Sequence, residues 1–171
     1  MNATRVPAKS ILRKRLDTAY FCDCFEMPIK NNDRSALELY LGAVRHTPKW
    51  IDFLMKLRNR VVALFGLKDL GQLSDVEKAK DPASYKVGDR VGIFSIVAMT
   101  DQEVVLGDAD KHLNAQVSVY KHSEPERRVS VTTMVHVNNL LGRVYLFFVV
   151  PVHKVIVPSM LTRMVKAAEN A

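Results

Sequence analysis

The chain has 171 residues, of which 48% are hydrophobic and 25% charged, with seven glycines and seven prolines. This length and composition are typical of a single soluble globular domain, and they exclude collagen-like, low-complexity and intrinsically disordered chains. The formal net charge of +7 can indicate a nucleic-acid or anionic-surface partner. Five basic residues lie within the first 15 positions, however, and the others are interspersed with acids, so nucleic-acid binding is not favoured.

Residues 1–16 are interpreted as a basic N-terminal arm and residues 17–171 as a single domain. The arm has no apolar run behind its positive charges, so no secretory signal is expected. Cys22 and Cys24 lie two apart on a predicted strand, where disulfide geometry is rarely reached. No second cysteine pair or nearby histidine completes a zinc site. We therefore expect two packed free thiols in a cytoplasmic protein.

The stretch "TAYFCDCFEMPI", residues 18–29, is the first predicted strand, because it is rich in aromatic residues and ends at Pro28. The alternation of a strand places Phe21, Asp23 and Phe25 on one face and the two cysteines on the other.

Two short helices are predicted after this strand. Ser35 and Glu38 have the spacing of a capping box, which satisfies free amides at a helix start. The second helix is predicted from Pro48 to Phe65, with Thr47 as its N-cap and Gly66 as its C-terminal stop. Its basic residues resemble those of a DNA-reading helix-turn-helix. Its wide apolar stripe, however, is needed for packing against the strands that follow.

After a charged connection at residues 68–88, the hydrophobic period changes to two. Four strands with short turns are predicted between residues 89 and 138, as an antiparallel meander with one wet face and one dry face. The turn "DADKHL", residues 108–113, is predicted to be tight, with acids that hydrogen-bond their own backbone. His112 and His136 are expected on the polar face of the sheet.

The most apolar stretch is "LGRVYLFFVVPVHKVIVPSML", residues 141–161, which could be a membrane span, a strand followed by a helix, or one long helix. A span needs roughly 20 mostly apolar residues, whereas the uninterrupted run Val144–Val152 has nine. His153 and Lys154 would then lie near the bilayer centre, where a lysine costs roughly 2.5–3.5 kcal/mol. We therefore do not expect a transmembrane segment.

Two interpretations of residues 141–161 remain, a strand followed by a helix and one long helix. "RVYLFFVV" suits a strand, after which Pro151 could begin a shorter helix. As a single helix, the segment is capped by Asn139, and Pro151 and Pro158 bend it on one side. We expect the single long helix.

The order of strand, two helices, antiparallel strands and long C-terminal helix resembles the helix-grip fold of the START-like, polyketide-cyclase-like (SRPBCC) superfamily. More closely, the chain is similar to an uncharacterised bacterial family within that group, from about residue 18 onward. The resemblance is carried by "TPKWIDFLMKLRNRVVALFGL", "YKVGDRVGIF", "VVLGDADKHL", "VTTMVHVNNLLGRVYL" and "VPVHKVIVPSML". It implies an α+β fold in which a curved antiparallel sheet wraps around the C-terminal helix.

The resemblance also implies an apolar cavity between the sheet and the long helix. Members of the superfamily bind lipids, hydrophobic metabolites or polyketide intermediates, and a minority catalyse cyclisation or dehydration. A solid, close-packed core without a ligand is the alternative. The residues expected to line the cavity are Phe21, Phe25, Leu113, Ala115, Val117, Val131, Thr133, Val135, Leu146, Phe147, Val150 and Lys154.

Asp23 is the one candidate catalytic residue, since it would face the interior together with Phe21 and Phe25. An interior carboxylate suits a general base or a partner for a ligand hydroxyl. The opposite register would leave Asp23 in solvent and both thiols inside. The resemblance to the family does not assign a catalytic role to any residue of this chain.

The leading hypothesis is a protein without a cofactor that binds a small hydrophobic molecule or lipid. The second is a cyclase-type or dehydratase-type enzyme that uses Asp23, and the third is a nucleic-acid or anionic-surface binder. None of the five histidines has a metal-binding spacing, so no metal is expected. The sequence does not identify the ligand, and it is compatible with a homodimer.

Overall fold

The computed structural model describes residues 4–30, 33–63, 71–76, 80–123, 125 and 127–170. Its six strands form one antiparallel sheet, and they are β1 (Phe21–Pro28), β2 (Arg90–Val91), β3 (Phe94–Met99), β4 (Glu103–Ala109), β5 (Leu113–Lys121) and β6 (Arg128–Val137). The strand order is β1-β6-β5-β4-β3-β2. Strands β3 to β6 therefore form the predicted meander, and the first strand of the chain joins it at the β6 edge. The first of the four predicted strands, from residue 89, is divided into β2 and β3, which pair with each other.

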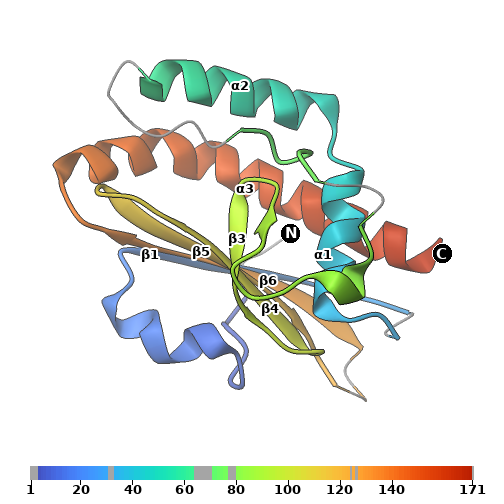
Figure 1. The fold of residues 1–171 in the computed structure, drawn as a ribbon. Coiled ribbons are helices and arrows are strands. Elements are labelled where there is room, and N and C mark those ends of the chain that lie inside the picture. The colour runs from blue at the N-terminus through green and yellow to red at the C-terminus, as the bar shows by residue number, and fades with distance from the viewer. Residues whose placement is uncertain are drawn as a thin grey trace.

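The helices are α1 (Ala36–Arg45), α2 (Lys49–Ala63) and α3 (Leu140–Glu169), together with the 3₁₀-helices η1 (Ile11–Thr18) and η2 (Pro82–Ser84). In Figure 1, α3 lies across one face of the curved sheet, α2 runs along α3, and η1 lies on the opposite side of the sheet. This arrangement confirms the predicted α+β fold and agrees with a helix grip. The predicted end of the second helix at Phe65 and Gly66 lies outside the described residues.

The segment around Val144–Val150 is helical throughout, so the single-helix prediction is confirmed and the strand alternative is wrong. Helix α3 has 30 residues and continues through Pro151 and Pro158. Asn139 caps it, because its Oδ1 accepts a hydrogen bond from the Gly142 amide at 3.1 Å.

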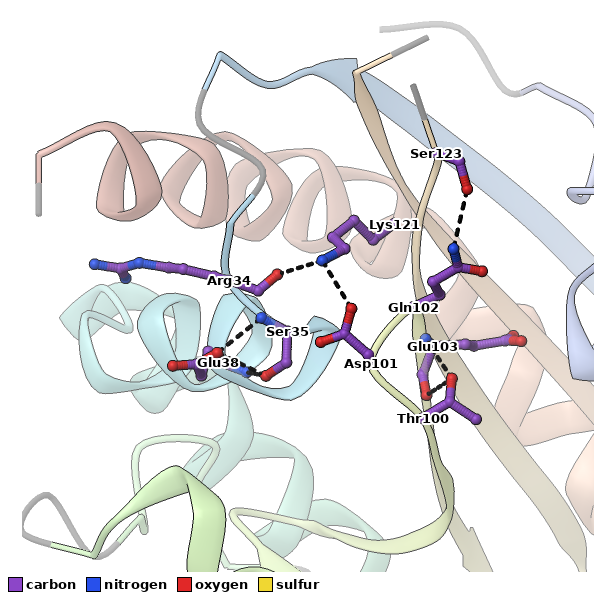
Figure 2. Close-up of polar contacts among 9 residues, drawn as sticks. All are labelled: Arg34, Ser35, Glu38, Thr100, Asp101, Gln102, Glu103, Lys121 and Ser123. Carbon is purple, nitrogen blue, oxygen red and sulfur yellow. Dashed lines mark hydrogen bonds and ion pairs between the residues drawn. The ribbon is translucent and has the colours of Figure 1, made fainter. Parts of the chain in front are cut away.

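The start of α1 is fixed at one end of the sheet, as Figure 2 shows. The predicted capping box forms: the Glu38 amide donates to Ser35 Oγ at 3.3 Å, and the Ser35 amide donates to Glu38 Oε2 at 2.7 Å. Lys121 of β5 donates through Nζ to the Arg34 carbonyl at 2.9 Å and to Asp101 Oδ2 at 3.2 Å. These bonds join α1 to the β3–β4 turn.

The face of the sheet that meets α1 and α3, here called the inner face, carries the main core. Register pairs Asp23 with Thr133, and Thr133 with Val117, so these side chains lie in one row across the inner face. The core between this face and the helices includes Leu39, Leu41, Ile96, Leu106, Val119, Val129, Leu161 and Met164.

The sequence predicted that the opposite, outer face of the sheet is solvated. In the structure this face is partly covered. Residues of the N-terminal segment cover part of it, where Leu12 packs with Val105 and Met134. Glu103 is 2% exposed and accepts hydrogen bonds from Ser10 Oγ at 2.6 Å, Ser118 Oγ at 2.6 Å and the Ile11 amide at 2.8 Å. The polar residues of this face are buried because they pair with one another and with the covering segment.

Replacing Ser10 with Ala should test this attachment. A hydrogen bond to a buried charged group contributes about 1.5–3 kcal/mol, so we expect Ser10→Ala to lower the free energy of unfolding by about that amount in urea titrations. Ser123→Ala is the matched control, because Ser123 is exposed and accepts from Gln102 Nε2 at 3.0 Å. Equal midpoints for the two variants would contradict a structural role for the Ser10–Glu103 contact.

The two thiols lie on the outer face and are free, as predicted. Burial, with smaller effects of Asp23 and Cys24, raises the pKa of the Cys22 thiol from 9.0 to about 11. Burial is also the main cause of the raised pKa of the Cys24 thiol. The folded state therefore disfavours both thiolates. For Cys22, folding with a protonated thiol contributes its full stability below pH 9, and this stability is lost as the pH rises through the folded-state pKa of about 11.

We expect both thiols to react slowly with a disulfide reagent between pH 7 and 8, since the thiolate is the reactive form. The reaction rate of Cys22 in the folded protein should still rise with pH at about pH 11. In the urea-unfolded chain the rate should level off above the ordinary thiol pKa of 9.0. Coincident rate profiles for folded and unfolded protein would contradict this assignment.

Candidate functional site

Asp23 of β1 and His153 of α3 meet on the inner face. His153 Nε2 lies 3.0 Å from Asp23 Oδ1 and 3.1 Å from Oδ2. The Asp23 side chain is 7% exposed and the His153 side chain 16%. Asp23 therefore lies in the interior, as the alternation of β1 predicted. Its histidine partner was not predicted.

Neighbouring residues fix the orientation of this pair. The Phe21 ring meets the His153 ring edge to face, with centroids 5.7 Å apart and planes at 87°. On α3, Val150 and Val157 lie three residues before and four after His153, so they share its face of the helix. An aromatic ring and an apolar helix face thus surround the hydrogen bond on two sides.

The two ring nitrogens of His153 have different surroundings. An ionised carboxylate only accepts hydrogen bonds, so Nε2 is the donor to Asp23. The Nδ1 atom has no hydrogen-bond partner within the part of the chain that the structure describes. In the neutral ring Nδ1 is an acceptor, so that form of the ring has a lone pair left for another molecule.

Thr133 adds a third polar group, directly opposite Asp23 in the β1–β6 register. Thr133 is 6% exposed, and its buried Oγ1 has no hydrogen-bond partner among the described residues. Leaving a buried hydroxyl unpaired costs about 1–3 kcal/mol. Asp23, Thr133 and His153 are called the polar centre below.

Apolar residues predicted to line a cavity surround the polar centre on the inner face. Leu113, Val135 and Leu146 form one buried cluster with Phe21, Ala115 and Val150 packed against it. Phe25 and Val131 belong to the main core, with Val117 packed against it. The members that keep partial contact with solvent are Phe21, Ala115, Val117 and Val150.

Two predicted lining residues point elsewhere. Phe147 is 76% exposed, and Lys154 is exposed as well. Successive helix residues are turned by about 100°, so each of these side chains is rotated away from its sheet-facing neighbour, Leu146 or His153. The sequence could not set this rotation, because apolar residues occur all around α3.

The turn predicted at residues 108–113 is confirmed for residues 110–112, where Asp110 Oδ1 accepts from the His112 amide at 2.6 Å and the Leu113 amide at 2.9 Å. The prediction is wrong for Asp108 and Ala109, which belong to β4 and pair with β5. His112, expected on the polar face, is instead buried, with Nδ1 2.9 Å from Asn139 Nδ2. It packs against the start of α3 because the chain turns back there. His136 does lie on the outer face, where Nε2 is 3.1 Å from Thr18 Oγ1.

A groove of about 500 Å³ lies on the other side of the sheet, lined by Lys9, Ile11, Thr100, Asp101, Gln102, Glu103 and Tyr120. Its central polar groups are paired internally, since the Glu103 amide donates to Thr100 Oγ1 at 2.9 Å and the Glu103 carboxylate holds Ser10. Among the described residues no group of three or more His, Cys, Asp or Glu could hold a metal ion. The polar centre is therefore the strongest candidate site.

Comparison with known proteins gives one family. The model of a protein of unknown function (DUF2867) matches residues 15–160, a range that contains all three members of the polar centre. No curated protein and no solved structure matches the chain.

Thr133→Val tests whether the Thr133 hydroxyl is unpaired. Val keeps the shape and removes a buried polar atom, so we expect the free energy of unfolding to rise by about 1–2 kcal/mol, measured by urea titration. The control is Thr132→Val, since Thr132 Oγ1 donates to Cys24 Sγ at 3.3 Å on the outer face and should give no such gain. A loss of stability in Thr133→Val would mean that the hydroxyl has a partner.

Proposed function

The chain belongs to the family of proteins of unknown function DUF2867, and we propose that it binds a small apolar molecule between the sheet and α3. The polar centre takes the one polar group of this ligand. The observation that carries the proposal is a buried hydroxyl and a histidine nitrogen, both without partners in the described chain, within an otherwise apolar face. Sites for small molecules usually combine apolar walls with a few placed polar groups.

The row of residues across the sheet supports a ligand with one polar end. Asp23, Thr133, Val117 and Leu106 lie side by side in the register of four neighbouring strands. Polarity is thus confined to the β1–β6 end, and the row continues with apolar side chains. Ile156, Val157 and Met160 of α3 lie partly buried against the same core. An elongated apolar body extending from the polar centre towards β4 suits this arrangement.

The chemistry of the polar centre favours a hydroxyl group on the ligand. A hydroxyl is both a donor and an acceptor, so it could donate to His153 Nδ1 or accept from Thr133 Oγ1. A ligand carboxylate would instead bring a second negative charge near Asp23, which is 9% exposed as a whole residue and poorly screened by water. Long-chain alcohols and phenols are therefore favoured over fatty acids.

Membership of the START-like, polyketide-cyclase-like superfamily is part of this proposal. The sheet wrapped around α3 agrees with a helix grip, and proteins of that superfamily hold apolar ligands between the same two elements. The likeness supports the location of the ligand and says nothing of its identity.

Binding can be tested with 1-dodecanol, 1-naphthol and dodecanoate by thermal shift and native mass spectrometry. We expect the alcohol and the phenol to raise the melting temperature, since a ligand that binds only the folded state stabilises it. Dodecanoate should have a smaller effect. Thr133→Val should weaken 1-dodecanol binding about fivefold to tenfold, as loss of one hydrogen bond implies, while Thr132→Val should bind as the wild type does.

Two results would refute binding at the polar centre. One is the absence of stabilisation by any of the three probes. The other is equal binding by wild type, Thr133→Val and Asp23→Asn, which would locate the ligand elsewhere.

A catalytic role is the second candidate, because a carboxylate-oriented imidazole with an open nitrogen is the arrangement of a general base. Here His153 would accept a proton from the ligand, and Asp23 would position the ring and stabilise its protonated form. Cyclisation or dehydration of a bound ligand would use such a base.

Asp23→Asn separates binding from catalysis, because it keeps the shape of the side chain and removes its charge. For an enzyme we expect the affinity to change by no more than a few fold, while turnover falls by about 100-fold or more. Turnover is followed by mass spectrometry as loss of water from the ligand or as a product of equal mass and changed retention. Unchanged turnover in Asp23→Asn would exclude this role for the pair.

A further inference from the structure

Helix α2 exposes large apolar side chains that its position in the fold does not cover. Trp50 is 40% exposed, Phe53 64% and Leu57 48%. They lie on one side of the helix, whereas Ile51 is fully buried and Met55 packs against the main core. The exposed basic residues next to the three apolar ones are Lys49, Lys56 and Arg60. Helix α2 has one acidic residue, the partly buried Asp52.

The first half of α3 exposes a second apolar face, opposite the one that meets the sheet. Its most exposed members are Leu140 (73%), Val144 (49%), Phe147 (76%), Phe148 (68%) and Val155 (60%). Arg143 and Lys154 are exposed beside them, and α3 has no acidic residue before Glu169.

A direct contact holds the two helices together. Arg58 Nε of α2 donates to the Tyr145 hydroxyl of α3 at 3.1 Å, and the guanidinium lies 5.4 Å from the centroid of the Tyr145 ring. Figure 1 shows α2 running along α3 on the helical side of the molecule. The exposed apolar and basic residues of α2 and those of α3 are together called the helical surface below.

We propose that the helical surface binds the surface of a membrane that contains anionic lipids. Several large apolar residues exposed together on a folded protein indicate a surface that a partner covers. A helix with Trp, Phe and Leu on one side and Lys and Arg beside them has the composition of segments that lie in the interface of a bilayer. The cations would meet lipid phosphates, and the apolar side chains would enter the boundary with the acyl chains.

The charge of the surface decides between a bilayer and other partners. In a two-fold dimer through this face, the same patch of each copy would meet the other. The cations Lys49, Lys56 and Arg60 of both copies would then share one interface, and like charges oppose such contact. A nucleic acid could pair with the cations, but it offers little to cover exposed aliphatic residues such as Leu57, Val144 and Val155. An anionic bilayer complements both the charge and the apolar area.

This role does not require α3 to cross the membrane. By length and composition α3 could span a bilayer, and 17% of its most apolar window is buried in the fold. Its other face is packed through Leu161, Met164 and Val165 into the main core, which contains residues of α1 and of the sheet, and His153 is hydrogen-bonded to Asp23. Peripheral binding keeps these contacts and covers the remaining apolar side.

Vesicle binding tests the proposal, and the chain provides its own reporter, because Trp50 is its one tryptophan. We expect the protein to sediment with phosphatidylcholine vesicles that contain phosphatidylglycerol, and its emission to shift to shorter wavelength. Pure phosphatidylcholine vesicles should bind it weakly, and added salt should reduce binding to the anionic vesicles.

Matched variants separate a specific surface from general positive charge. Each lysine at an anionic membrane contributes about fivefold, so Lys49→Gln with Lys56→Gln should weaken binding about 25-fold. Lys9→Gln with Lys14→Gln, which removes the same charge from the exposed N-terminal segment, should leave binding nearly unchanged. Phe53→Ser should weaken binding about tenfold without lowering the melting temperature, because Phe53 is mostly exposed.

Three outcomes would overturn the proposal. The first is no binding to anionic vesicles, and the second is equal weakening by the two lysine pairs. The third is a dimer in light scattering that Phe53→Ser dissociates, which would assign the helical surface to a second copy of the chain.

Discussion

The packing of α3 on the inner face of the sheet is the interaction on which the rest of the structure depends. Together with the contact between α3 and α1, it buries Leu146, Leu161, Met164 and Val165, and it gives the valine-rich inner face a cover that α1 alone could not provide. The same packing brings His153 to Asp23, from residues 130 apart in the sequence. Core and candidate site therefore depend on one contact between an edge strand and the last helix.

The two sides of α3 have different surroundings. The side towards the sheet combines close packing near the C-terminal end, at Leu161 and Met164, with the polar centre near the middle of the helix. The opposite side remains apolar and exposed around Phe147 and Phe148. A helix that is apolar all round is normally buried all round, and the departure of α3 from that rule is what suggests a lipid surface.

Local patterns in the sequence predicted the elements of the fold and the direction of Asp23. The capping box at Ser35, the Asn139 cap and the alternation of β1 each depend on residues a few positions apart, where sequence and geometry are directly linked. The partner of Asp23 could not be predicted in this way. The rotation of α3 about its axis decides whether His153 or Lys154 faces the sheet, and an evenly apolar helix gives no signal for that rotation.

The covered outer face was missed for a related reason. Ser118, Ser130 and Thr132 alternate with valines as solvated residues do, and yet all three are buried. A serine or threonine hydroxyl is compatible with either environment, because its neighbours in space decide whether it is paired. Here Glu103 and Ser10 provide part of that pairing from distant positions. Charge is the main signal that the N-terminal segment offers in the sequence, and charge does not predict its packing.

The strand order has a consequence for how the protein is made. Among the described strands β1 pairs with β6 alone, and Pro28 pairs with Arg128, so 100 residues separate the paired ends. At the usual pace of about 5–20 residues per second, a nascent β1 emerges from the ribosome about 5–20 seconds before its partner. During that interval the aromatic residues and the hydrogen-bonding edge of β1 have no native cover.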